Sequence, residues 1–510
     1  MRPNVILFSD HTEVLYMQKT LGVFKVANEL RNAGFTVQVI SHLHVFSVDE
    51  VKQLLSDLVG DQTIFIGFSP FFYKLTEDPE IASTGAPHQL GGTYYRRKQL
   101  GSMLPQGIKY NQEIKQHVLK LNPNCRFVLG GPDAIDSDHV KDYDYVVIGY
   151  ADNSVVNLAQ HLSCGQPLNN SRKSLYGPVI VDDRVADGYN FTGIPTLYSA
   201  NDLILPGETI SIEISRGCIF RCKFCAYPLN GKNKTDYIKF ENILYQEFLD
   251  NYQRYGVTRY TFADDTFNDS PEKVHMLHRI SQRLPFELEY WAYIRLDLLS
   301  RYPETIRLLY ESGCRAFYFG IETMHAEASK AIGKGGDRKK HIDTLQQLKN
   351  MYGNKVMLHG SFIFGLPKED IDSMKYTGTQ LITGEIPLDS WFINPLYFSP
   401  QRNFVSELDK NFANYGYNLQ ALKDGKYDWK NEYTDFQQCN DIANQIMIDG
   451  DLLGQKKISG AQSFYIAGLG FDLDYSCNKS IADFDWHSVT LKKQQRQLEY
   501  KSALKNLLSS

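Results

Sequence analysis

Strand-like and helix-like patterns alternate six times between about residues 207 and 400. The strand-like runs are Ile210–Ile214, Arg259–Phe262, Glu289–Ala292, Ala316–Phe319, Met357–Phe364 and Ser390–Asn394, and helical patterns such as Phe240–Tyr255 and Lys339–Met351 lie between them. Strands that alternate with helices indicate right-handed βαβ units and a parallel sheet. Six units are too few for a closed eightfold barrel. The sequence therefore predicts a partial (β/α)6 barrel of the TIM type over residues 206–400.

The first 165 residues show the same alternation with a different spacing. Apolar, strand-like runs occur at Val5–Ser9, Phe35–Ile40, Thr63–Phe68, Arg126–Leu129 and Tyr145–Ile148, and Leu21–Asn32 carries a helical pattern that ends at Gly34. Strands that are buried on both faces and separated by helices are typical of a doubly wound sheet. We therefore expect an α/β chain whose residues 1–165 form a Rossmann-like domain ahead of the barrel.

Three other stretches carry weaker patterns. Residues 166–205 show no clear periodicity and read as a connector. The polar, Gly-rich stretch from Phe72 to about Tyr110 reads as a long inserted loop. Residues 401–510 contain no repeat or clear motif, and we expect this C-terminal extension to cover the substrate.

Composition places the chain among soluble globular proteins. Its 510 residues are 43% hydrophobic and 22% charged, and a net charge of −5 argues against a dominant polyanion-binding surface. No run approaches the ~18–20 apolar residues that span a bilayer. Eight cysteines do not make a disulfide scaffold in a chain of this length. We expect a cytoplasmic protein that makes no membrane contact.

Three cysteines, Cys218, Cys222 and Cys225, directly follow the first strand of the expected barrel with the spacing C-x3-C-x2-C. Three thiolates can hold three irons of a [4Fe–4S] cluster and leave the fourth iron open for chemistry. A structural zinc site is the alternative, but it needs a fourth Cys or His, and the nearest downstream histidine is His275. A disulfide reading fails because the number of cysteines in the motif is odd.

This cysteine motif resembles that of the radical S-adenosylmethionine (SAM) enzymes, in which the open iron chelates the amino and carboxylate groups of SAM. The resemblance implies a [4Fe–4S] cluster and SAM as cofactors, with Cys218, Cys222 and Cys225 as the catalytic cluster ligands. It also implies reductive cleavage of SAM to a 5′-deoxyadenosyl radical. The aromatic position beside the adenine is implied to be Phe224.

Further segments at the expected strand ends resemble the SAM-binding motifs of that family, in the same order. An acidic residue beside the SAM ammonium is physically sensible as its charge partner. An arginine at a strand end could pair with the SAM carboxylate or order the pocket. A glycine before an inward-facing acid permits close backbone approach. The implied SAM-binding residues are Asp264, Asp265, Thr266, Arg295, Gly320, Glu322, Gly360, Ile363 and Gly365.

A doubly wound domain ahead of such a barrel resembles the cobalamin-binding (B12-binding) branch of the family. Ser69 and the pair Gly130 and Gly131 match the strand-end positions that hold the cobalamin nucleotide tail. The cobalt-ligating His of many cobalamin proteins is missing, because Met17 and Lys19 stand where Asp and His would be. Radical SAM members commonly lack this His, so cobalamin stays the expectation, and a merely architectural domain is the alternative.

The leading functional hypothesis is a cobalamin-dependent radical SAM methyltransferase that acts on an unactivated carbon. A radical SAM oxidoreductase, cyclase or rearrangement enzyme is the second hypothesis, and a non-catalytic iron–sulfur or other metal-binding module is the third. The expected partners are a small-molecule or nucleotide substrate and an electron donor such as flavodoxin or ferredoxin. Nucleic acid is not favoured, because nothing resembles a tRNA-binding module.

Overall fold

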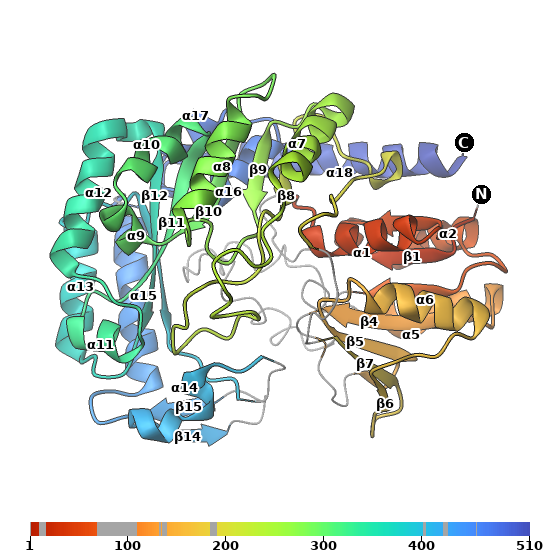
Figure 1. The fold of residues 1–510 in the computed structure, drawn as a ribbon, viewed down its shortest axis with the longest axis horizontal. Coiled ribbons are helices and arrows are strands. Elements are labelled where there is room, and N and C mark those ends of the chain that lie inside the picture. The colour runs from red at the N-terminus through yellow and green to blue at the C-terminus, as the bar shows by residue number, and fades with distance from the viewer. Residues whose placement is uncertain are drawn as a thin grey trace.

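The computed structural model describes residues 2–9, 17–68, 110–131, 134, 140–183, 191–400, 404–421, 427–454 and 456–509. It contains two large sheets, with the N-terminal sheet on one side of the molecule and the barrel on the other (Figure 1). Ser69 and residues 72–109 of the expected loop lie outside the described part. Among the described helices, none is both long and apolar enough to cross a membrane.

The N-terminal sheet has seven strands in the order β2-β1-β3-β4-β5-β7-β6, and all neighbours are parallel except β6 and β7. Its strands are β1 (Val5–Phe8), β2 (Val37–Ile40), β3 (Phe65–Phe68), β4 (Arg126–Gly131), β5 (Tyr145–Gly149), β6 (Ser171–Lys173) and β7 (Val179–Asp183). The first three strands are buried along their whole length, which explains their continuous apolar sequence. The doubly wound fold is confirmed.

Helices cover both faces of this sheet. α1 (Leu21–Asn32) and α6 (Ser154–Cys164) pack together on one face, and α2 (Val48–Leu58) and α5 (Tyr110–Leu121) pack together on the other. Two 3-10 turns, η1 (Leu43–Val45) and η3 (Ala200–Asp202), complete the described elements of residues 2–205. The expected connector differs from the structure, because residues 166–205 supply β6 and β7 to the sheet.

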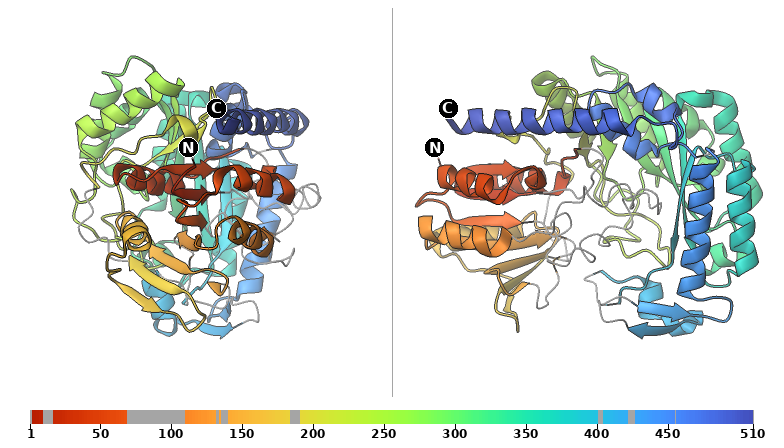
Figure 2. Two further views of the ribbon diagram at one scale, coloured as in Figure 1. Left: turned by 90° about the vertical axis from the view of Figure 1, so that its right-hand side faces the viewer. Right: turned by 180° about the vertical axis from the view of Figure 1, so that it is seen from behind.

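The second sheet is the predicted partial barrel. Its six strands are all parallel and lie in chain order: β8 (Ile210–Ile212), β9 (Arg259–Phe262), β10 (Glu289–Ile294), β11 (Cys314–Glu322), β12 (Met357–Phe364) and β13 (Ser390–Pro395). Intervening helices form an outer layer (Figure 2): α7 (Glu241–Tyr255), α8 (Pro271–Ser281), α9 (Leu296–Arg301), α10 (Glu304–Glu311), α11 (Ala326–Ala331), α12 (Arg338–Tyr352) with the turn η4 (Gly353–Lys355), and α13 (Ile371–Thr383).

The C-terminal extension divides into parts with different neighbours. It contains α14 (Glu407–Lys410), η5 (Phe412–Tyr415), β14 (Asn418–Ala421), β15 (Tyr427–Lys430), α15 (Phe436–Leu452), α16 (Gly460–Gly468), α17 (Leu473–Asn478) and α18 (Trp486–Ser509). α15 extends the outer layer beside β13, and α16 packs across β9 to β12. At Gly460 a Cβ atom would come within 2.3 Å of the Ala316 Cβ, so α16 fills the bottom of the barrel.

α18 returns to the N-terminal sheet. The Tyr500 hydroxyl accepts a hydrogen bond from the Ser41 amide at 3.0 Å, and Lys501 pairs with Glu50 of α2 at 2.8 Å. The last helix therefore ties the N-terminal domain to the barrel from behind (Figure 2).

Candidate active site

The three cysteines lie on one loop that leaves the C-terminal end of β8. The Gly231 amide donates to the Cys218 carbonyl at 2.7 Å, and the Cys225 amide donates to the Cys222 carbonyl at 3.1 Å. Gly217 has a φ of +71°, and a Cβ there would lie 2.5 Å from the Leu229 side chain, so only glycine fits. The loop is thus folded back on itself, with the cysteines at the carboxyl end of the sheet, where barrel folds place their chemistry.

All three thiols are free of disulfides, and they lie in a sheltered environment. Burial raises the pKa of Cys225 to about 11 and also raises the pKa of Cys218. Bound metal would be the positive charge that favours the thiolates. Three soft sulfur donors suit iron in a cluster. No group of three or more His, Cys, Asp or Glu side chains in the described ranges converges closely enough to hold a single metal ion, whereas cluster thiolates each bind a separate iron.

The two neighbouring acids after β9 have different surroundings. Asp264 is 1% exposed and accepts hydrogen bonds from the Ile214 amide at 3.0 Å and the Ser215 amide at 2.6 Å. The Ser215 hydroxyl also donates to it, at 2.6 Å. Asp264 therefore fastens the start of the cysteine loop to β9, and both of its carboxylate oxygens already accept hydrogen bonds within the protein.

Asp265 is only half-buried, and no described residue donates a hydrogen bond to its carboxylate. Burial, together with the nearby Asp264 and Glu213 carboxylates, raises the pKa of Asp265 to about 7. A carboxylate without a partner in such a place fits a cationic group such as an ammonium. Of the expected acidic pair, Asp265 is thus the residue that can meet a ligand.

Thr266 and Arg295 lie beside the cluster cysteines. The Thr266 Oγ1 is 3.5 Å from the Cys218 Sγ, and the Arg295 Nη1 is 3.5 Å from the Cys222 Sγ. Arg295 is 4% exposed and is also held by Asp297, with a hydrogen bond of 2.9 Å. These contacts make Arg295 a residue that orders the pocket wall next to Cys222.

Glu322 lies at the end of β11 in a strained backbone conformation with a φ of +70°, next to a bulge. Its carboxylate pairs with the Lys334 ammonium at 3.2 Å, a partner that the sequence analysis missed. At Gly320 a Cβ would lie 2.6 Å from the Glu322 Oε1, so glycine makes room for this acid. Lys334 also lies 6.0 Å from the ring centre of the half-buried Phe224, which brings this pair close to the cysteine loop.

Three residues in β12 or directly after it were expected to contact SAM, and they have different surroundings. Gly360 accommodates Leu388, because a Cβ there would come within 2.5 Å of that side chain. The Gly365 amide donates to Glu369 at 3.0 Å, and its carbonyl accepts from Tyr417 at 2.6 Å. Both of its backbone groups are thus bonded within the protein, while Ile363 stays half-buried.

The structure describes three residues at the expected cobalamin site, two glycines and a lysine whose ammonium is already ion-paired. At Gly130 a Cβ would make only ordinary contact with Val147, at 3.7 Å, and Gly131 has a φ of +137°. The backbone here is paired with β5, and the Gly131 carbonyl accepts a hydrogen bond from the Ala134 amide at 3.1 Å, but neither glycine has a side chain that would block a ligand. Lys19, which stands in place of the cobalt-ligating His, is 2% exposed and pairs with Glu208 at 2.6 Å.

A buried ionic network joins the cysteine loop to the N-terminal domain, and the sequence analysis did not find it. The Arg216 guanidinium donates two hydrogen bonds to Asp152, which follows β5, one of them at 3.0 Å. It also donates two to Glu213, at 2.7 Å and 3.4 Å. Lys25 of α1 pairs with Glu213 at 3.1 Å. Burial would raise the pKa of Glu213, but Arg216 and Lys25 outweigh it and hold this pKa at about 2. The carboxyl ends of β5 and β8 therefore face each other.

Comparison with known proteins finds partial matches that include this site. Residues 212–379 match the Radical SAM superfamily. The chain is 30% identical over 169 residues, 32% of its length and 35% of the relative's, to an uncharacterized methyltransferase of Pyrococcus horikoshii. It is 24% identical over 226 residues, 43% of its length and 48% of the relative's, to bacteriochlorophyllide d C-12(1)-methyltransferase of Chlorobaculum tepidum. The matched stretches thus span a third to a half of these relatives.

The whole fold has a solved counterpart. The radical SAM methyltransferase TsrM from Kitasatospora setae, determined with cobalamin and a [4Fe–4S] cluster bound, matches with a TM-score of 0.62 at 14% identity. The match covers 99% of this chain and 100% of that one. This likeness establishes the arrangement of a doubly wound domain followed by a partial barrel.

Proposed function

We propose that this chain, whose residues 212–379 match the Radical SAM superfamily, is a cobalamin-dependent radical SAM methyltransferase that acts on a small molecule. The observation that carries the proposal is the position of the cysteine loop. It leaves the carboxyl end of β8, lies beside the unpartnered Asp265, and is joined to the N-terminal sheet through Arg216 and Asp152. Cofactors held by the two domains would therefore face each other.

The residues of the barrel mouth fit a cluster and SAM. Cys218, Cys222 and Cys225 would hold a [4Fe–4S] cluster, which when bound supplies the electron that cleaves SAM to methionine and a 5′-deoxyadenosyl radical. Asp265 would accept the SAM ammonium, and Phe224 would flank the adenine. Because Asp264 and Arg295 are fixed by internal bonds, they keep the loop and the pocket wall in place. Such a fixed, sheltered pocket also excludes water from reactive species.

The N-terminal domain would supply the second cofactor. The lack of side chains at Gly130 and Gly131 supports a cobalamin nucleotide tail at the end of β4, and the solved TsrM structure holds cobalamin in the same overall fold. The methyltransferase names of the relatives support methylation as the reaction. We also propose that the substrate is a small organic molecule and that the protein works in a reducing cytoplasm.

One observation favours a second candidate. Lys19 is held by Glu208 where many cobalamin proteins place the cobalt ligand, which supports a domain that binds nothing and a non-methylating radical SAM reaction. Oxidation, cyclisation and rearrangement belong to this second class.

The test is anaerobic reconstitution with iron and sulfide, followed by a visible spectrum and product analysis with SAM and a strong reductant. Formation of S-adenosylhomocysteine together with 5′-deoxyadenosine, on protein that retains cobalamin, is the expected result. 5′-Deoxyadenosine alone would refute methyl transfer and favour the second candidate. Protein that binds a cluster but never cleaves SAM would refute both and leave a metal-binding module.

A further inference from the structure

Lys273 is a fully buried lysine that contacts the start of the cysteine loop. It lies in the first turn of α8, where the positive end of the helix dipole opposes another positive charge. Its side chain is 0% exposed, so its ammonium has also lost its contact with water. None of the contacts proposed for the cofactors uses it. A cation in such a place needs close partners of opposite charge.

The groups that its ammonium contacts lie on the cysteine loop and on the segment after β9. It donates hydrogen bonds to the Ser215 hydroxyl at 2.8 Å and to the Thr266 carbonyl at 2.9 Å, and it pairs with Asp269 at 2.6 Å. The Asp269 Oδ1 has no hydrogen-bond partner among the described residues. Its ion pair with Lys273 is therefore the direct compensation for the charge of a residue that is 3% exposed.

These groups lie on both sides of Cys218. Ser215 precedes this cysteine by three residues, and the Ile219 amide, directly after it, donates to the Asp269 Oδ2 at 3.4 Å. One ammonium thus joins the two chain segments that flank the first cysteine of the motif. The direction of the Cys218 thiol therefore depends on Lys273.

Asp269 also acts on Cys218 through its charge. Burial raises the pKa of Cys218, and the Asp269 carboxylate raises it further. A negative charge at this place disfavours a thiolate, and it disfavours an added electron on a cluster that the thiolate holds. The ammonium of Lys273 opposes this effect, because it lies against the same carboxylate.

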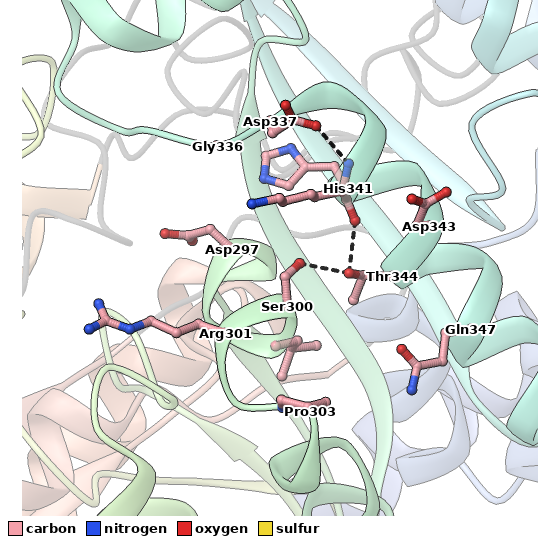
Figure 3. A pocket seen from close by; sticks show the side chains of 12 residues that line it. Asp297, Ser300, Arg301, Pro303, Gly336, Asp337, His341, Asp343, Thr344 and Gln347 are labelled. Carbon is pink, nitrogen blue, oxygen red and sulfur yellow. Dashed lines mark hydrogen bonds between the residues drawn. The ribbon is translucent and has the colours of Figure 1, made fainter.

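The support of Cys222 differs, because it reaches the surface. Arg295, 3.5 Å from the Cys222 Sγ, donates to Asp297, which lines a groove of about 690 Å³ between α9 and α12 (Figure 3). The Asp297 side chain is 27% exposed, so solvent screens its charge. Lys273 and Asp269 have fully buried side chains, and their charges are screened much less.

We propose that Lys273 is a positioning residue for the cluster ligand Cys218. It holds Ser215 and Asp269 on the two sides of this cysteine, and it neutralises the Asp269 carboxylate. The proposal rests on the proposed function, because it concerns a cluster bound at Cys218, but it involves neither SAM nor cobalamin.

The test compares Lys273→Met, Asp269→Asn and the double variant with wild type, each as the full chain reconstituted with its cluster. The matched control is Lys239→Met. The ammonium of Lys239 pairs with Glu247, and both side chains of this pair are fully buried as well, but it donates to Thr196 at 3.4 Å instead of to the cysteine loop. Thermal unfolding gives the stability of each protein, and a redox titration followed by electron paramagnetic resonance gives the reduction potential of its cluster.

The potentials should follow the charge beside Cys218. Lys273→Met is expected to lower the potential, Asp269→Asn to raise it, and the double variant to return it close to the wild-type value, because both charges are then gone. Lys239→Met should lower the Tm while leaving the potential unchanged. Equal potentials in wild type, Lys273→Met and Asp269→Asn would overturn the proposal. If Lys273→Met does not fold, Asp269→Asn decides alone, because it keeps the ammonium.

Alkylation of the metal-free full chain tests the positioning without a cluster. The rate at Cys218 is measured by mass spectrometry against the exposed Cys164 as internal reference. Lys273→Met should be alkylated at Cys218 at least about 10-fold faster than wild type, since the lost contacts make local opening of the loop more frequent. Equal rates in Lys273→Met and Lys239→Met would overturn the positioning role. Wild-type protein that takes up no cluster would refute the proposed function instead, while these rates still test Lys273.

Discussion

Replacing Arg216 with Met should destabilise the protein strongly, because it removes the cation that Asp152 and Glu213 share. Arg216 is 7% exposed and Asp152 is 3% exposed, so the carboxylates would be left buried without this partner. Breaking a buried ion pair from one side costs about 3–5 kcal/mol. The pKa of Glu213 falls from 4.5 to about 2 because its cationic neighbours, Arg216 first among them, outweigh its burial, which corresponds to a net of about 3 kcal/mol at ~1.4 kcal/mol per pKa unit.

Thermal unfolding of the reconstituted protein measures this loss. About 3 kcal/mol corresponds to a fall in Tm of about 6–12 °C for a unit of 150–250 residues. The matched control is Arg279→Met, because the exposed Arg279 pairs with Glu241 on the surface, where an ion pair contributes less than about 1 kcal/mol. A fall of less than 2 °C for Arg216→Met, or equal falls for the two variants, would refute the reasoning.

The pH dependence gives a second check on the same network. A carboxylate whose pKa is lowered by folding stabilises the protein above its unfolded pKa, and this stabilisation is lost as the pH falls toward the folded value. For Glu213 the window lies between about pH 5 and pH 2. The difference in Tm between wild type and Arg216→Met should therefore be largest at neutral pH and shrink on acidification. A difference that grows as the pH falls would contradict the assignment.

Three further variants test the remaining parts of the site. Cys222→Ala should lose bound iron and SAM cleavage together, which iron analysis and 5′-deoxyadenosine formation measure; full activity would exclude the cluster mechanism. Asp264→Asn should lower the Tm by removing an acceptor of buried hydrogen bonds, at a cost of about 1–3 kcal/mol, whereas Asp265→Asn should keep the Tm and weaken SAM binding in calorimetry. If Asp265→Asn lowered the Tm and Asp264→Asn weakened SAM binding instead, the roles assigned to the two acids would be exchanged. Gly365→Ala should destabilise by about 1–3 kcal/mol, because its Cβ would lie 2.4 Å from the Trp429 ring at a φ of +84°; an unchanged Tm would show that the extension packs differently there.

The sequence predicted the second sheet well because its signal is local. Each strand of the barrel is apolar and is followed by a helix with its own periodicity, so chain order and spatial order coincide. The helix Leu21–Asn32 was predicted with its observed bounds for the same reason. By contrast, β6 is a three-residue strand whose residues are all exposed, and β7 is only partly buried. Their place in the sheet depends on neighbours far along the chain, which periodicity does not reveal.

Within the site, the sequence identified residue types at strand ends but not how each is used. Asp264 and Asp265 are adjacent and chemically identical, and only the hydrogen bonds from the start of the cysteine loop separate the structural acid from the available one. Lys334 and Arg216 were missed because their partners, Glu322 and Asp152, lie on other elements. The sequence does show a basic residue two positions before the first cysteine. The role of Arg216, however, depends on its contact with the N-terminal domain, which the sequence does not reveal.

The contact between Arg216 and Asp152 bears on how the two domains would act together. Asp152 follows β5 at the carboxyl end of the N-terminal sheet, and Arg216 lies two residues before Cys218. A ligand that shifts the turn after β5 would also pull on the cysteine loop, because a bidentate Arg–carboxylate pair constrains direction as well as distance. Buried, shared charges cannot separate without a large cost, so the two cofactor-facing edges are held at a fixed spacing. A reaction that needs one cofactor from each domain depends on that spacing.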